Sequence, residues 1–149
     1  MAKRVLIVDD DTDTVKFLSV ALTENGYEAV GTYNGKEGLQ KVEQQTPDLI
    51  ILDVMMPQRS GLVLFRQLRR DDRYKDIPVM MLTGVPASLQ ELDEKEDDTF
   101  ETPYDSMREA LRKMIAAMRE EGEVRPELFI EKPVDPEAVI NKVRELIGQ

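Results

Sequence analysis

The chain has 149 residues, no cysteine, no histidine and a formal net charge of −10. Its length fits one domain, and the missing residue types exclude disulfides, thiolate metal sites and histidine-based catalysis on this chain. The negative charge argues against nucleic acid as a direct partner, because phosphate backbones attract basic surfaces. The sequence has neither the apolar stretch of a signal peptide nor a run approaching the roughly 20 residues of a membrane helix. We therefore expect a soluble cytoplasmic protein.

Short apolar runs of strand length alternate with helical patterns along the chain. The runs lie at residues 5–8, 28–32, 49–52, 77–82 and 128–130. The first and third are continuous apolar stretches, which are typical of strands that helices cover on both faces. Strands and helices in alternation predict an α/β fold with a doubly wound parallel sheet and helices on both of its faces.

Capping residues mark where the intervening helices begin and end. Asn, Ser and Asp side chains accept hydrogen bonds from the free N–H groups of a first helical turn, and Gly commonly follows the last turn. The expected boundaries are a stop at Gly26 and starts at Asn34, Ser60 and Asp135.

Polar residues end four of the five predicted strands. They are Asp9-Asp10, Asp53, Thr83 and Glu131-Lys132. In open parallel sheets ligands bind beyond the carboxyl ends of the strands, where the strand order reverses. The fold would therefore gather the carboxylates of the three aspartates, a hydroxyl and an ammonium group at one edge of the sheet.

The acids that follow the first strand, in the stretch VLIVDDDTDT, suit three chemistries. The first is a calcium loop, because Asp9, Asp11 and Asp13 have the alternate spacing of an EF-hand. That loop requires Gly where this chain has Thr14, and a bidentate Glu where it has Val20. The calcium loop is therefore rejected.

The second chemistry is that of a phosphatase with an aspartyl nucleophile. Residues 11–15, DTDTV, match the D-x-D-x-T/V motif of haloacid-dehalogenase-type phosphatases. In that family the nucleophile lies directly at a strand end, whereas Asp11 lies two residues later, where a helix should begin. The family also needs a late acidic pair for Mg²⁺, and here only Glu131 and Asp135 are available. A Mg²⁺-dependent phosphatase using Asp11 and Asp13 remains the alternative interpretation.

The third chemistry uses every strand end. The stretches VLIVDDD, PDLIILDVMMPQRSG, VMMLTG and FIEKPVDP together resemble the receiver domain of two-component response regulators. The resemblance implies a flavodoxin-like sheet with strand order 2-1-3-4-5. It also implies one receiver domain over residues 1–149 that accepts a phosphoryl group and signals, and is not a conventional enzyme.

The resemblance assigns a role to each strand-end residue. Asp53 would be the phosphoacceptor, and Mg²⁺ would be bound by Asp9, Asp10, Asp53 and the carbonyl oxygen of Met55. Hard oxygen ligands of this kind suit Mg²⁺. Thr83 and Lys132 would contact the phosphoryl oxygens, and Lys132 would be aimed by a cis bond to Pro133.

The same resemblance implies a switch, in which Thr83 moves toward the phosphoryl group and Phe129 repacks. It also places Met55 and Val85 beside the water that would hydrolyse the phosphoryl group. Neither side chain can hydrogen-bond that water usefully, so slow autodephosphorylation is expected. Each residue also has a simpler explanation: the acids could cap a helix, and Phe129 could belong to the core.

The segment between Thr83 and Lys132 is longer than receiver domains need. It predicts an insertion and an extended fourth helix at about residues 86–122, with an acidic loop at 91–101. Apolar side chains share one face of this helix, and three of them are Met, which makes an adaptable contact surface.

The expected partners follow from the resemblance and from the length of the chain. The phosphoryl donor would be a sensor histidine kinase or a histidine phosphotransfer protein. No output domain is expected after Gln149, so the output would be a protein–protein interaction. A homodimer through the face formed by the fourth helix, fifth strand and fifth helix is a further expectation.

Overall fold

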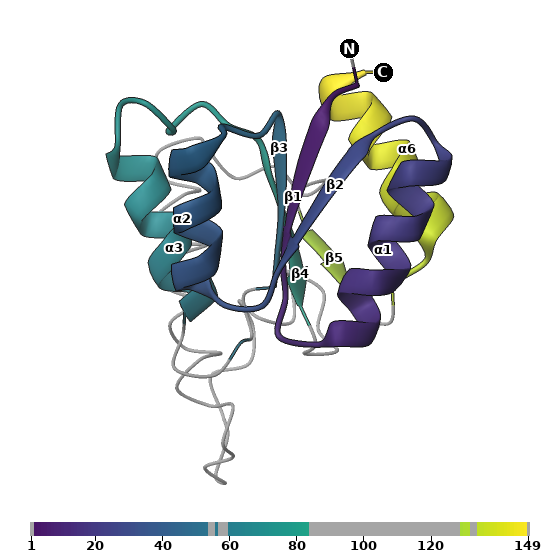
Figure 1. The fold of residues 1–149 in the computed structure, drawn as a ribbon, viewed down its shortest axis with the longest axis horizontal. Helices are drawn as coiled ribbons and strands as arrows, with labels where there is room; N and C mark the ends of the chain where they lie inside the picture. Colours follow the sequence, from purple (N-terminus) through teal and green to yellow (C-terminus); the bar gives the residue numbers. More distant parts are fainter. Residues whose placement is uncertain (1, 54–55, 57–59, 84–128, 132–133, 149) are drawn as a thin grey trace, which may run out of the picture.

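Five parallel strands form one sheet in the order β2-β1-β3-β4-β5, which is the predicted order (Figure 1). In the computed structural model the described residues are 2–53, 56, 60–83, 129–131 and 134–148. The strands are β1 (Arg4–Val8), β2 (Glu28–Thr32), β3 (Leu49–Asp53), β4 (Val79–Thr83) and β5 (Phe129–Glu131). Because all five run in parallel, their carboxyl ends meet at one edge.

Helices cover both faces of this sheet. They are α1 (Thr12–Glu24), α2 (Gly35–Gln44), α3 (Ser60–Arg70) and α6 (Pro136–Ile147). Figure 1 shows α1 and α6 side by side against one face, with α2 and α3 against the other. No helix within these described ranges is both long and apolar enough to cross a membrane.

The central strands are buried because their side chains alternate between two apolar layers. On β1, Leu6 and Val8 pack in the layer under α2 and α3. Val5 and Ile7 pack in the layer under α1 and α6. All five residues of β3 are buried. The continuous apolar runs in the sequence therefore reflect burial on both faces, as predicted.

Local hydrogen bonds explain where the helices stop and start. After α1, Gly26 has a φ of 88°, its N–H donates to Thr23, and the N–H of Tyr27 donates to Leu22. This is the pattern of a Schellman motif. The side chains of Asn34 and Asp135 accept N–H groups from the first turns of α2 and α6, as predicted.

Several predicted boundaries differ from those of the structure by one or two residues. The fourth strand begins at Val79 rather than at Ile77. The N–H of Ile77 donates to Tyr74 within a turn, and Pro78 has no N–H to give to a ladder. Ser60 is the first residue of α3 rather than the residue before it. The predicted insertion and extended helix at 86–122 lie outside the described residues.

Candidate functional site

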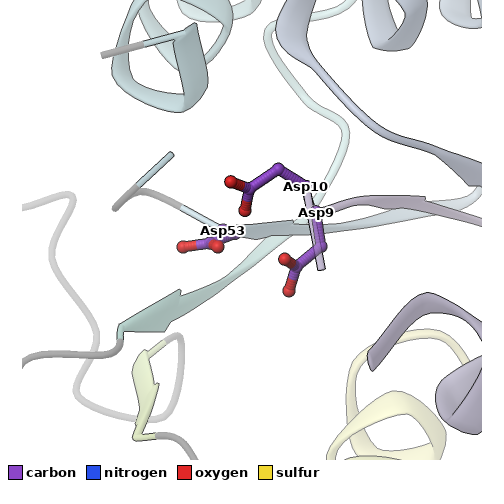
Figure 2. Close-up of side chains that lie close together, drawn as sticks. All are labelled: Asp9, Asp10 and Asp53. Atoms are coloured by element: carbon purple, nitrogen blue, oxygen red, sulfur yellow. The ribbon is translucent and has the colours of Figure 1, made fainter. Parts of the chain in front are cut away.

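Three carboxylates lie together at the carboxyl edge of the sheet. One oxygen from each of Asp9, Asp10 and Asp53 lies within 4.8 Å of the others. Figure 2 shows the three side chains gathered beyond the ends of β1 and β3. Asp9 and Asp53 are buried, with exposed fractions of 0% and 3%, and Asp10 is exposed. The structure thus brings together the three acids that the sequence places at strand ends.

Asp9 is held by the backbone on both sides. Its N–H donates to the carbonyl of Thr32 over 3.1 Å, which extends the β1–β2 ladder by one step. Its Oδ1 accepts the N–H of Asp11 over 2.9 Å. The chain turns at this point from β1 into α1. The carboxylate of Asp9 is therefore fixed at the start of that turn.

Asp53 occupies the last position of the central strand. Its Cα is paired with that of Leu82 in the neighbouring β4. Thr83 follows as the last residue of β4, and its Cα is paired with that of Glu131 in β5. The register therefore carries the ends of β4 and β5 to the edge where Asp53 lies.

Other predicted site residues are placed only in part. Thr83 ends β4 and Phe129 begins β5, and their roles in phosphoryl contact and switching stay predictions. Met55, Lys132 and Pro133 lie outside the described residues.

Asp11 has a different role from its neighbours Asp9 and Asp10. It is the N-cap of α1, and its Oδ1 accepts the N–H of Asp13 over 3.0 Å. Its Oδ2 accepts the hydroxyl of Thr14 over 2.9 Å. Such a cap satisfies free N–H groups of the first turn. The simpler explanation, helix capping, thus holds for Asp11, whereas Asp9 and Asp10 lie in the acidic cluster.

The donor set of the cluster suits a hard divalent cation. Three carboxylate oxygens this close repel one another, and a cation among them would relieve the repulsion. Mg²⁺ and Ca²⁺ prefer oxygen ligands of this kind. One exposed carboxylate beside two buried ones leaves an open side for water or a reacting group.

Comparison with known proteins decides the family. The model of the response regulator receiver domain matches residues 5–94. This chain belongs to the response regulator receiver domain family.

Curated relatives with the receiver domain are longer than this chain. The DNA-binding dual master transcriptional regulator RpaA of Synechocystis is 37% identical over 119 residues, which cover 78% of this chain and 49% of RpaA. The phosphate regulon regulator PhoB of Pseudomonas aeruginosa is 36% identical over 125 residues, which cover 82% of this chain and 54% of PhoB. The chain thus spans about half the length of these relatives.

Solved structures share the fold over nearly the whole chain. The receiver domain of a signal transduction histidine kinase from Syntrophus aciditrophicus is 27% identical, with a TM-score of 0.67, over 98% of this chain and 90% of that one. The chemotaxis response regulator CheY4 of Vibrio cholerae superposes with a TM-score of 0.69 at 23% identity, over 98% and 99% of the two chains. At this level of identity, the similarity to CheY4 supports the fold alone.

The family settles the class of activity. Receiver domains of response regulators accept a phosphoryl group on an aspartate and signal through it, in a two-component system with a histidine kinase. The phosphatase interpretation gains no support, because both oxygens of Asp11 bind groups at the start of α1.

Nothing in the sequence alone singles out Thr32 as a functional residue. Its strand is the faintest of the five apolar runs, and a Thr in a strand is ordinary. In the receiver domain it is buried, and its carbonyl binds the N–H of Asp9. Thr32 can be recognised as a neighbour of Asp9 only once the strand order, which places β2 beside β1, is known.

Proposed function

We propose that this receiver domain accepts the phosphoryl group on Asp53, with Mg²⁺ bound by Asp9, Asp10, Asp53 and the carbonyl oxygen of Met55. The observation that carries the proposal is the convergence of three carboxylates, two of them buried, at the end of the central strands. Asp53 is the member of the cluster that ends β3, between β1 and β4. The match to the receiver family includes all three acids.

In the proposed transfer a carboxylate oxygen of Asp53 attacks the phosphorus atom of the donor. A P–O bond to Asp53 forms, and the bond from phosphorus to the donor's leaving group breaks. When bound, Mg²⁺ supplies charge neutralisation for the phosphoryl oxygens. Thr83 donates its hydroxyl hydrogen to one of these oxygens, and Lys132 contributes a positive charge. Phe129 then repacks, and the covalent product decays slowly.

The test uses acetyl phosphate as a small donor. Intact mass measurement should find one phosphoryl group per chain with Mg²⁺ and none with EDTA. Asp53→Asn should abolish the adduct while the far-ultraviolet circular dichroism is kept. Unchanged labelling of Asp53→Asn would reject Asp53 as the acceptor.

We also propose that the donor protein docks on the groove between α1 and α6. The groove has a volume of about 670 Å³, and its lining includes Phe17, Val20 and Ile140. Phe17 and Val20 are 46% and 52% exposed, which is high for such side chains. Asp13, in the first turn of α1, lies at the groove as well. The groove therefore begins within a few residues of Asp9 and Asp10, where a donor must bring its phosphoryl group.

Variants can separate docking from chemistry. Phe17→Ala with Val20→Ala should slow transfer from a phosphorylated donor protein and leave uptake from acetyl phosphate unchanged. Val63→Ala is the matched control, because Val63 is 50% exposed on α3, against the other face of the sheet. Equal transfer rates for all three proteins would reject the groove as the docking surface.

The signalling output of the phosphorylated domain is the last part of the proposed function. We propose a cytoplasmic module over residues 1–149 that acts by protein–protein interaction, because its net charge of −10 opposes contact with nucleic acid. The predicted dimer face includes the extended helix, which lies outside the described residues. Sedimentation of the protein with and without acetyl phosphate tests dimer formation on that face.

A further inference from the structure

Three polar or charged side chains are buried in the part of the chain that the structure describes, and one of them lies outside the acidic cluster. They are Asp9, Thr32 and Asp53. Thr32 is also the only buried residue of β2, which is one of the two edge strands of the sheet. A hydroxyl group thus stands at the one position of β2 where an apolar side chain would be expected.

Hydrogen bonds connect Thr32 with the strand that leads into Asp9. The hydroxyl of Thr32 donates to the carbonyl of Ile7 over 2.9 Å. The carbonyl of Thr32 accepts the N–H of Asp9 over 3.1 Å. The Cα of Thr32 is paired with that of Val8, between these two contacts. Thr32 of β2 therefore forms hydrogen bonds with β1 at the residues on both sides of Val8.

We propose that Thr32 is a positioning residue for Asp9 and thereby sets the affinity of the acidic cluster for Mg²⁺. The inference rests on the proposed function, in which Asp9 belongs to the metal site. The hydroxyl bond to Ile7 holds the end of β2 in register with the end of β1. This register keeps the carbonyl of Thr32 opposite the N–H of Asp9.

The backbone of Asp9 is thus anchored on the β2 side, while its Oδ1 is anchored by the N–H of Asp11. The two anchors limit how far the carboxylate can turn relative to Asp10 and Asp53. Partners that orient metal ligands contribute strongly to metal affinity. Thr32 acts through the backbone, at a distance from the cation.

Substitutions of Thr32 distinguish a residue that only fills space from one that positions Asp9. Thr32→Val keeps the shape of the side chain and removes the hydroxyl, whereas Thr32→Ser keeps the hydroxyl and removes the methyl group. If Thr32 only fills space, Ser should be the more harmful change and metal affinity should not follow the hydroxyl. If it positions Asp9, affinity should follow the hydroxyl and not the volume.

The experiment measures Mg²⁺ binding by isothermal titration calorimetry and amide hydrogen exchange of Asp9 by NMR. For Thr32→Val we expect the dissociation constant for Mg²⁺ to rise about tenfold and the Asp9 amide to exchange faster in metal-free buffer. Thr32→Ser should keep the parent's affinity even where its urea midpoint falls. Thr23→Val, at an exposed position of α1, is the matched control and should change neither quantity.

Parental affinity and parental exchange in Thr32→Val would overturn the inference while leaving the proposed function intact. A parent protein that binds no Mg²⁺ would overturn the proposed metal site and, with it, this inference. If Thr32→Val does not fold, Thr32→Ala and Thr32→Ser give the same comparison, because they differ only in the hydroxyl group. Equal Mg²⁺ affinities in that pair would likewise overturn the inference.

Discussion

The substitution Asp53→Asn should stabilise the protein without metal and remove its stabilisation by metal. One carboxylate oxygen from each of Asp53, Asp9 and Asp10 lies within 4.8 Å of the other two. At that separation and an effective dielectric constant of about 20, each pair of unit charges repels by about 3.5 kcal/mol. Water around the exposed Asp10 screens its share of this repulsion. We therefore expect Asp53→Asn to raise the free energy of unfolding by about 2 kcal/mol in EDTA.

Mg²⁺ should remove or reverse the difference in unfolding free energy between Asp53→Asn and the parent protein. At 100 times its dissociation constant, a ligand that binds only the folded state stabilises it by about 2.7 kcal/mol. The parent should gain this amount, while Asp53→Asn, which lacks one charged ligand, should gain little. The two proteins should therefore differ by about 2 kcal/mol in EDTA and by about zero, or with the opposite sign, in saturating Mg²⁺.

Urea denaturation followed by circular dichroism measures both values, since the chain has no Trp for fluorescence. Asp72→Asn is the control, because the side chain of Asp72 is 97% exposed and its ion pair with Lys75 is 3.6 Å long. Exposed pairs of this kind contribute about 0.5 kcal/mol or less in either buffer. A variant at Asp53 that is less stable than the parent in EDTA would refute the repulsion argument.

Three further substitutions test other parts of the structure, each by urea denaturation. Gly31→Ala should cost about 1–2 kcal/mol, because its Cβ would lie 2.5 Å from Cγ1 of Val15; a cost that persists in a Val15→Ala background would refute this cause. Tyr27→Phe should cost about 1 kcal/mol, since its hydroxyl donates to the carbonyl of Gly148 over 2.7 Å, and no change would show that water replaces the bond fully. Asp11→Ala should lower the free energy of unfolding by about 1 kcal/mol through loss of the helix cap and leave phosphoryl uptake from acetyl phosphate unchanged. Loss of phosphoryl uptake in a folded Asp11→Ala protein would show that Asp11 takes part in the phosphoryl chemistry.

Much of the fold could be predicted because its signals are local. Burial on both faces shows in the continuous apolar runs of β1 and β3, and the caps Asn34 and Asp135 act within their own first turns. The start of β4 was predicted two residues too early, because Ile77 is apolar and continues the apolar run of the strand. Its N–H is instead bound within a turn that depends on Tyr74.

The candidate site was predictable as a set and less so residue by residue. Parallel strands bring Asp9, Asp10 and Asp53 to one edge, so strand-end acids suffice as a signal. The sequence places Asp11 two residues beyond the strand end, where a helix should begin, but only its contacts with Asp13 and Thr14 show that it caps α1. Thr32 was missed because its contacts depend on which strand lies beside β1.

The most direct test of the account locates the phosphoryl group on the parent protein. The protein is phosphorylated with acetyl phosphate and Mg²⁺, reduced with borohydride to convert the aspartyl phosphate to homoserine, digested and sequenced by tandem mass spectrometry. The account predicts homoserine at residue 53 and at no other aspartate. Homoserine at residue 11, or at residue 9 or 10 with Asp53 unmodified, would contradict it.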